Sequence, residues 1–545
     1  MLAAVPDHED DRPGSEKAAA TTRKATGATR KATGARQASG TRKASGTRKA
    51  SGTRQATGAT DEAPRATGPR DRPGVAGSEG VLPAGFRFGV ATAGFQIEGG
   101  FNGPGEPANN WVSWERAGRV EPSGIAIDFW NRYEDHLDRA AAMGCDAFRL
   151  GVEWARVQPD EDEVDRSALD RYAAILDACR ARGMEPLVTL HHFTHPAWLG
   201  EDFWLSSEAP ARYAAWVETA VSALASRCTT WVTLNEVNAL AMGAYLLGIF
   251  PPGRRLAFAD AASALDHLLA AHVKGYEVIH RLQPEATVTT NNVSLSLYEL
   301  DRMLVDVLAA RTVGVEHAAL TPWVGSRRAA WYADLAPARP LERLLRRGMA
   351  SVWTGAQHLP GAVQAVWDSP HPRTLDVVGI DYYDPVIARH ARLPGHRTAG
   401  GRSWLASNDL WDDHVVPGGL GEYARASSLP GLDLWVVENG LCNRVRRGRS
   451  FPRLDGWDRV RYLRENLAAL VDAVEGGLPV TAYYHWTLAD NYEWGSYEPR
   501  FGLHGVDRER GTKVLDTDAM GVDAAGAFRR IVDGLRAGDR SVIGR

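Results

Sequence analysis

Cysteine is scarce in this sequence, with 4 residues among 545. Cys145, Cys179, Cys228 and Cys442 are scattered, form no CxxC pair and have no histidine at ligand spacing. That pattern argues against a disulfide framework and against a zinc site. We therefore expect reduced thiols, no metal and no cofactor.

Long hydrophobic runs are also missing. The longest candidate, "ALAMGAYLLGIF" at 239–250, contains two glycines and falls short of the roughly 18 residues that cross a bilayer. The amino-terminal stretch "MLAAVPDHEDDRPG" meets acidic residues before any apolar segment, which is unlike a secretory signal. With 44% hydrophobic residues, the sequence predicts a soluble cytoplasmic protein with no membrane partner and a sizeable core.

Residues 1–80 read as a basic low-complexity arm. Between residues 23 and 58 a unit of the type RKATG or RQASG occurs six times, carrying six Arg and four Lys but no acid, aromatic, Leu, Ile or Val. Such a segment cannot offset its ordering entropy, so we predict disorder. A solvated tail, or a reading frame begun upstream of the true start, is favoured over a tether for nucleic acid. A transit peptide fits less well, because the arm lacks an apolar face.

The composition changes near Val81, and no linker or second break follows. Short β-rich apolar runs then recur with amphipathic stretches between most of them, which is typical of a (β/α)8 barrel. We predict one such barrel, an α/β TIM fold, over residues 81–545. The eight runs are residues 86–93, 147–154, 186–192, 230–236, 286–292, 376–383, 432–440 and 479–486.

Polar side chains gather where these runs end. In a barrel the carboxyl ends of the strands carry the catalytic residues, and the runs on strands four and seven end in Glu236 and Glu438. Two carboxyl groups that face each other across a barrel mouth suit glycoside hydrolysis. No phosphate-binding glycine loop, metal cluster or GxSxG elbow competes with them. Trp486 and Trp494 offer aromatic faces on which a sugar ring can pack.

Six motifs in order resemble glycoside hydrolase family 1, the retaining β-glycosidases of the β-glucosidase type. They are "FGVATAGFQIEGG", "FRLGVEWARVQP", "TLHHFTHPAWL", "TLNEVN", "VVENG" and "HWTLADNYEWGSYEPRFGLHGVD", within residues 81–520. The resemblance implies that Glu236 is the general acid/base and Glu438 the nucleophile, with Arg149 and Tyr383 beside it. It implies that the sugar is bound by Gln96, His192, Phe193, Asn235, Trp486, Glu493 and Trp494.

Three positions depart from the family's usual residues. Phe193 stands where a Trp usually follows the sugar-binding His, which keeps an aromatic wall but removes an N–H donor. Asp381 replaces an Asn, adding a carboxyl that could raise the pKa of Glu438 or require a partner such as Arg149. Val237 replaces the Pro that usually follows the acid/base. We expect altered sugar preference rather than lost chemistry.

The resemblance therefore implies a retaining hydrolase of terminal β-D-glucosyl residues in small glycosides, with galactosyl, fucosyl or mannosyl residues as further substrates. Water and the glycoside are the expected partners. A 6-phospho-β-glycosidase, a glycosyl-transferring relative and a non-catalytic sugar-binding or scaffold barrel with a polyanion-binding amino-terminal arm stay open as alternatives. Glu493 disfavours the first, since its charge would repel a 6-phosphate. The sequence leaves open the oligomeric state and the aglycone, which loops such as 296–345 and 393–430 would select.

Overall fold

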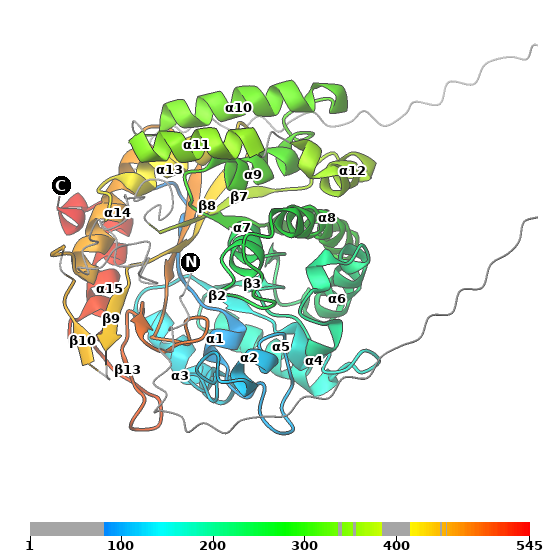
Figure 1. Ribbon diagram of the computed structural model, residues 1–545. Helices are drawn as coiled ribbons and strands as arrows, with labels where there is room; N and C mark the ends of the chain where they lie inside the picture. The colour runs from blue at the N-terminus through cyan, green and yellow to red at the C-terminus, as the bar shows by residue number, and fades with distance from the viewer. Residues whose placement is uncertain are drawn as a thin grey trace, which may run out of the picture. The chain divides into compact units, whose positions relative to one another are not determined.

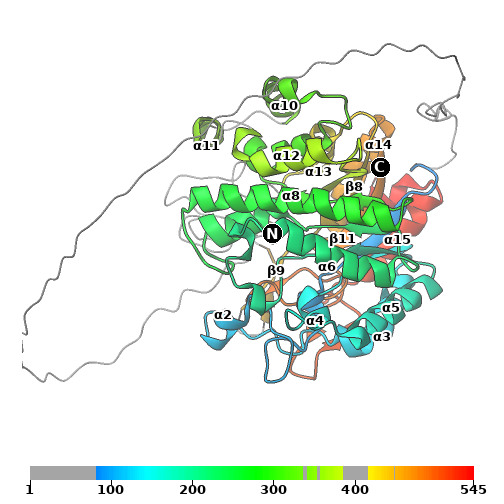
Figure 2. The same ribbon diagram turned by 90° about the vertical axis from the view of Figure 1, so that its right-hand side faces the viewer.

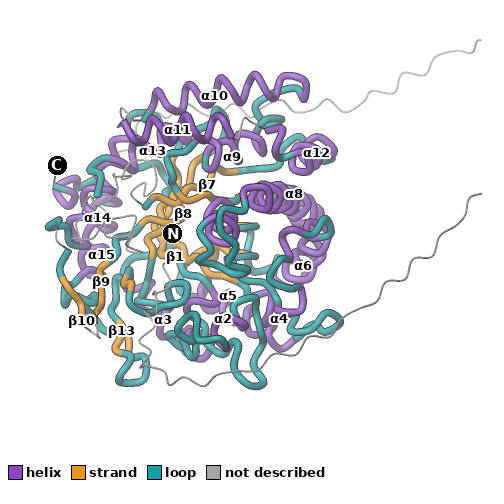
Figure 3. The backbone as a smooth tube through the Cα atoms, in the orientation of Figure 1, coloured by secondary structure: helices purple, strands orange, loops and turns teal. Residues whose placement is uncertain are grey.

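The computed structural model describes residues 81–335, 340–352, 356–383, 415–446, 449–453 and 455–544. In this part of the chain a ring of strands lies in the middle and helices surround it (Figure 3). The predicted (β/α)8 barrel is confirmed. The arm predicted at 1–80 lies outside the described residues, and so does much of the loop 393–430, so both remain predictions.

The barrel strands are all parallel and follow the order β5-β4-β3-β2-β1-β11-β8-β7-β6. β5 and β6 are two halves of one segment, separated only by Thr290, so this segment pairs with β4 at one end and β7 at the other and closes the ring. The eight predicted runs are thus the eight strands of the barrel, when β5 and β6 are counted as one. Their bounds are β1 Arg87–Ala91, β2 Ala147–Gly151, β3 Glu185–Thr189, β4 Thr230–Val232, β5 Thr287–Thr289, β6 Asn291–Val293, β7 Val377–Tyr382, β8 Asp433–Asn439 and β11 Val480–Trp486.

The longer helices form the outer layer, as Figure 1 shows with α6 and α8 side by side and α10 and α11 further out. The same layer is seen from the side in Figure 2, where α8 runs across the barrel. These helices are α3 Phe129–Ala142, α5 Arg166–Ala181, α6 Ala209–Leu224, α8 Phe258–Leu282, α9 Arg302–Ala309, α10 Leu320–Asp334, α11 Pro340–Val352, α12 Pro360–Asp368, α13 Gly419–Ser427, α14 Arg459–Glu475 and α15 Ala524–Arg536.

Local sequence explains where several of these helices begin. Asp165, Asp458 and Asp523 each cap a helix by accepting a hydrogen bond from a backbone N–H three residues on, for α5, α14 and α15 respectively. In α5 the apolar residues recur at helical spacing and are buried, as the sequence predicted. Capping and amphipathic periodicity together place these helices against the strands.

Short helices and two small sheets complete the described structure outside the barrel sheet. Four helices of one turn follow strands or connect them: α1 Gly94–Ile97, α2 Val112–Arg116, α4 Trp154–Val157 and α7 Val237–Ala241. Two small sheets, which follow β8 and β11 in the chain, are built from β9 Asn443–Arg446, β10 Arg449–Phe451 and β12 Pro499–Arg500, and from β13 Val506–Asp507 and β14 Lys513–Val514. All four cysteines are buried and free. Within the described residues, no helix combines the length and apolarity needed to cross a membrane.

Candidate active site

The predicted site residues all lie at or just beyond the carboxyl ends of barrel strands, and each of them is buried. Hydrogen bonds and ring contacts join ten of them, and Glu236 lies close to Glu438. They are Gln96 in α1, Arg149 on β2, His192 and Phe193 after β3, Asn235 and Glu236 after β4, Tyr383 after β7, Glu438 on β8, Trp486 on β11, and Glu493 and Trp494 beyond it.

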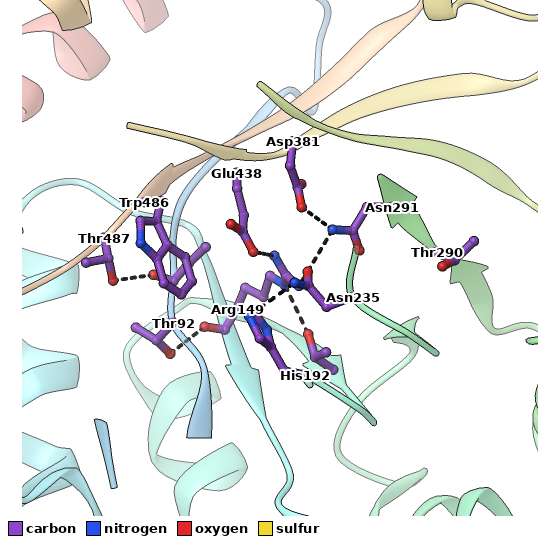
Figure 4. A network of polar contacts seen from close by, with 12 residues as sticks. Thr92, Arg149, His192, Asn235, Thr290, Asn291, Asp381, Glu438, Trp486 and Thr487 are labelled. Atoms are coloured by element: carbon purple, nitrogen blue, oxygen red, sulfur yellow. Dashed lines mark hydrogen bonds and ion pairs between the residues drawn. The ribbon is translucent and has the colours of Figure 1, made fainter. Parts of the chain in front are cut away.

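Arg149 occupies the centre of this network (Figure 4). Its Nη1 donates to Glu438 Oε1 at 2.6 Å, its Nη2 to Asn235 Oδ1 at 2.5 Å and its Nε to Thr189 Oγ1 at 3.0 Å. The guanidinium is fully buried, so its charge acts on Glu438 with little screening by solvent. One rigid donor group therefore orients a carboxylate and an amide from strands on different sides of the barrel.

The Asn235 amide can be oriented unambiguously. Its oxygen accepts from Arg149 and also from Asn291 Nδ2 at 2.7 Å, so its nitrogen must face His192 Nε2, 3.1 Å away. That ring nitrogen is then an acceptor, and the proton of the neutral imidazole lies on Nδ1. Burial, followed by the nearby Arg149, holds the pKa of His192 well below its usual range, which agrees with a neutral ring. His192 Nδ1 has no hydrogen-bond partner among the described residues and is free to donate to a ligand.

Glu438 is flanked by donors on both oxygens, because the Tyr383 hydroxyl donates to Oε2 at 2.8 Å. Burial raises the pKa of Glu438 to about 7, whereas Arg149, and less strongly the Tyr383 bond, lower it. Burial and the neighbouring Glu438 raise the pKa of the Tyr383 phenol well above its usual range, so the phenol remains a donor. The two donors thus offset part of the penalty that burial imposes on the carboxylate.

Glu236 faces Glu438 across the mouth of the barrel. One carboxylate oxygen of each lies, together with one oxygen of Asp381, within a group whose members are all within 4.8 Å of one another. Glu236 has a left-handed backbone, with φ 39° and ψ 59°, immediately before α7 begins at Val237. This conformation costs a non-glycine residue about 1–3 kcal/mol. Residues with such strained backbones cluster at active sites.

A second set of contacts lies at the end of β11. Glu493 Oε1 accepts from Trp486 Nε1, and its Oε2 accepts from Gln96 Nε2, each at 3.1 Å. Burial raises the pKa of Glu493 to about 8, although the Trp486 bond opposes this. The Gln96 Oε1 atom is buried and has no hydrogen-bond partner among the described residues. Glu493 and Gln96 together present the donors and acceptors that a ligand with several hydroxyl groups requires.

Aromatic rings connect the contacts around Arg149 with those around Glu493. His192 stacks on Trp486 and on Trp494, with ring centroids 5.8 and 5.6 Å apart. Phe193, at positive φ of 66°, packs on Trp494 with centroids 4.8 Å apart and on Phe250 at 5.2 Å. Phe193 therefore keeps an aromatic contact with the site, while its ring supplies no hydrogen-bond donor.

Thr189 was missed as a site residue from the sequence, and Asn291 was only one of the polar residues at strand ends, with no role assigned to it. Asn291 Nδ2 bridges Asn235 and Asp381, and Thr189 accepts from Arg149. Both lie at strand ends, which was the available signal, but that signal is shared with polar residues outside the site. The partner of Asp381 also differs from the one suggested, since its hydrogen bond comes from Asn291, not from Arg149.

Glu236, Asp381 and Glu438 form the single group in the described part of the chain with three side chains placed to hold a metal ion. Their positive counterpart is already present, because Arg149 donates to Glu438. A metal bound to Glu438 Oε1 would have to displace this guanidinium. The arrangement therefore favours chemistry carried by carboxyl groups and a fixed arginine.

The chain is similar to known proteins over most of its length. The sequence model of "Glycosyl hydrolase family 1" matches residues 78–323 and 371–517. A β-glucosidase of Agrobacterium sp. is 28% identical over 80% of this chain and 93% of its own length. A 6-phospho-β-galactosidase of Streptococcus pneumoniae is 24% identical over 81% and 97%. The structure of a β-glucosidase from Thermotoga maritima in complex with noeuromycin has a TM-score of 0.63, at 23% identity, over 83% of this chain and 99% of that one.

Proposed function

The chain belongs to glycosyl hydrolase family 1 and is an O-glycosyl hydrolase, and we propose that it releases terminal β-D-glucosyl residues from small glycosides with retention of configuration. One observation carries the proposal of retention: carboxylate oxygens of Glu236 and Glu438 lie within 4.8 Å of each other. Carboxyl groups in retaining enzymes are roughly 5 to 5.5 Å apart, whereas inverting enzymes leave about 6.5–9.5 Å for a water molecule.

In this proposal Glu438 attacks the anomeric carbon and forms a covalent glycosyl-enzyme, while Glu236 protonates the departing oxygen. Glu236 then takes a proton from water as the water attacks, and Glu438 leaves. The environments of the two residues support these roles. Glu438 accepts from Arg149 and Tyr383, which favour its charged form. Two donors fit a nucleophile that must be ionised at rest.

The sugar is held in this proposal by atoms that have no hydrogen-bond partner among the described residues. Gln96 Oε1, His192 Nδ1 and Asn291 Oδ1 are three such buried atoms around the site. Buried polar atoms normally find partners, and several hydroxyl groups on one ring would supply them together. Asn235 and Glu493 add contacts to the 2-hydroxyl and to the 4- and 6-hydroxyls, and Trp486 adds an aromatic face.

A panel of p-nitrophenyl glycosides tests the substrate. We expect the β-glucoside to be hydrolysed, with weaker turnover of the galactoside, fucoside or mannoside. If none of the glycosides is hydrolysed while sugar binding is retained, the non-catalytic barrel becomes the better explanation. Proton NMR of the first-formed sugar tests retention, because a β-anomer is expected and an α-anomer would contradict the double displacement.

Two variants test the assigned roles. Glu438→Gly should abolish turnover, and added azide should restore it with formation of the α-glycosyl azide. Glu236→Ala should slow hydrolysis, and with a substrate whose leaving group is good, azide should give the β-glycosyl azide. If Glu236→Ala gave the α-azide instead, the two roles would be exchanged.

A 6-phospho-β-glycosidase remains the second candidate, because a 6-phospho-β-galactosidase matches most of the chain. Glu493 argues against it: both of its oxygens accept hydrogen bonds, and no Lys or Arg in the described residues forms an ion pair with it. A phosphate at this place would meet a carboxyl group rather than a cation. Adding the 6-phosphorylated substrates to the panel decides between the two, since their preferential hydrolysis would overturn the glucoside proposal.

A further inference from the structure

Asp381 is a third carboxyl beside the two proposed catalytic ones. In the pairing of β7 with β8 it lies directly opposite Glu438, and it is fully buried. One of its oxygens belongs to the group within 4.8 Å that includes Glu236 and Glu438. Figure 4 shows its carboxyl group pointing between Glu438 and Asn291. Its charge therefore bears directly on the nucleophile.

The positive charge next to these three carboxyl groups is that of Arg149, which contacts Glu438 but not Asp381. Arg149 donates to Glu438, Asn235 and Thr189, and none of its hydrogen bonds reaches Asp381. The charged or titratable groups that face Asp381 are Glu438 from β8, Glu236 from the end of β4, Arg149 from β2, Tyr383 at the end of its own strand, and Tyr423 from α13. Among these groups in the described residues, only Arg149 is a cation.

The hydrogen bond to Asp381 has a known direction. Because Asn235 Oδ1 accepts from Arg149, Asn291 must turn its Nδ2 toward Asn235, and the same Nδ2 donates to Asp381 Oδ2. Asp381 Oδ2 is thus an acceptor. The other oxygen, Oδ1, is buried and has no hydrogen-bond partner among the described residues. A neutral carboxylic acid accepts this hydrogen bond through its carbonyl oxygen, and a proton on Oδ1 removes the negative charge from the buried side chain.

We propose that Asp381 holds a proton at the working pH and acts as a neutral positioning residue, which keeps Asn291 and Asn235 in place without adding a second negative charge beside Glu438. This inference rests on the proposed function of Glu438. Burial, followed by the charges of Glu438 and Glu236, raises the pKa of Asp381 well above its usual range. Other active sites also contain a carboxylic acid that its apolar surroundings keep neutral at neutral pH.

Asp381→Asn tests for the proton without any turnover. An unfolded Asp ionises near pH 3.9, so between about pH 5 and 7 the unfolded wild type is ionised here while the folded wild type keeps one more proton. Wild type then loses stability relative to D381N as the pH rises. We expect the ratio of the two unfolding equilibrium constants, wild type over variant, to rise about tenfold per pH unit in urea denaturation. A ratio that stays constant over this range would overturn the proposal.

The acid limb of the kcat/KM profile then shows which residue carries that proton. If Asp381 is neutral, D381N leaves the limb unchanged, because one neutral group replaces another. If instead Asp381 is ionised and Glu438 holds the proton, D381N removes a negative charge within 4.8 Å of Glu438. At an effective dielectric constant of about 20 that would move the limb down by roughly two pH units, which would overturn the proposal.

Asp162→Asn is the matched control, since it makes the same change at an exposed aspartate. It should leave the unfolding ratio flat and the acid limb unchanged. Should D381N fail to fold, Asp381→Ser is a second neutral replacement with the same expected outcomes. If wild type hydrolyses no β-glycoside, the proposed function fails, but a constant unfolding ratio would still overturn the proton on Asp381.

Discussion

Replacing Tyr383 by Phe removes a single interaction of the proposed nucleophile. The Tyr383 hydroxyl donates to Glu438 Oε2 at 2.8 Å inside a fully buried site. A hydrogen bond to a charged group contributes about 1.5–3 kcal/mol, so this bond stabilises the ionised form of Glu438 more than the neutral form. Because this bond lowers the pKa of Glu438, its loss raises that pKa. At about 1.4 kcal/mol per pH unit, the acid limb of kcat/KM should move up by roughly one to two pH units.

The assay is the pH profile of kcat/KM on a p-nitrophenyl β-glucoside, compared between wild type and Tyr383→Phe. On the acid side of the profile, kcat/KM should fall by roughly 10- to 100-fold, with a smaller loss where Glu438 is ionised in both proteins. Tyr298→Phe is the control, since the Tyr298 hydroxyl donates to Asp306 at 2.9 Å in a buried place outside the site. An acid limb that stays put in Y383F, or moves to lower pH, would refute the reasoning.

Three other perturbations follow from the same contacts. Arg149→Met leaves Glu438 buried without its cation, and the loss of roughly 3–5 kcal/mol should lower kcat/KM by about two to four orders of magnitude; near wild-type kinetics would contradict a role for the ion pair. Asn291→Ala frees Asn235 Oδ1 from one donor and should lower kcat/KM about fivefold on a glucoside but little on its 2-deoxy analogue, with equal losses on both arguing against the 2-hydroxyl contact. Removal of divalent metals with a chelator should leave activity unchanged, since Arg149 supplies the positive charge; inactivation that added metal reverses would show that the three carboxyls hold an ion.

Much of the fold could be predicted from local patterns. The eight barrel strands coincide with eight apolar runs because a parallel strand buried on both faces needs an unbroken apolar sequence. One feature was not predicted: the fifth strand is divided at Thr290 into β5, which pairs with β4, and β6, which pairs with β7. The sequence pattern does not predict this break, because β5 and most of β6 lie in the same β-rich run at 286–292.

The sequence by itself also identified the two carboxyl groups proposed for catalysis, because Glu236 and Glu438 both end strand-like runs on opposite sides of a ring. It could not determine which polar atoms meet inside that ring. Tertiary structure decided that Arg149 contacts Glu438 and Asn235 at once, and that Asp381 bonds to Asn291 rather than to Arg149. The reason is physical: sequence period assigns a side chain to a strand end, whereas a hydrogen bond between residues far apart in the chain depends on strand register, barrel radius and rotamer.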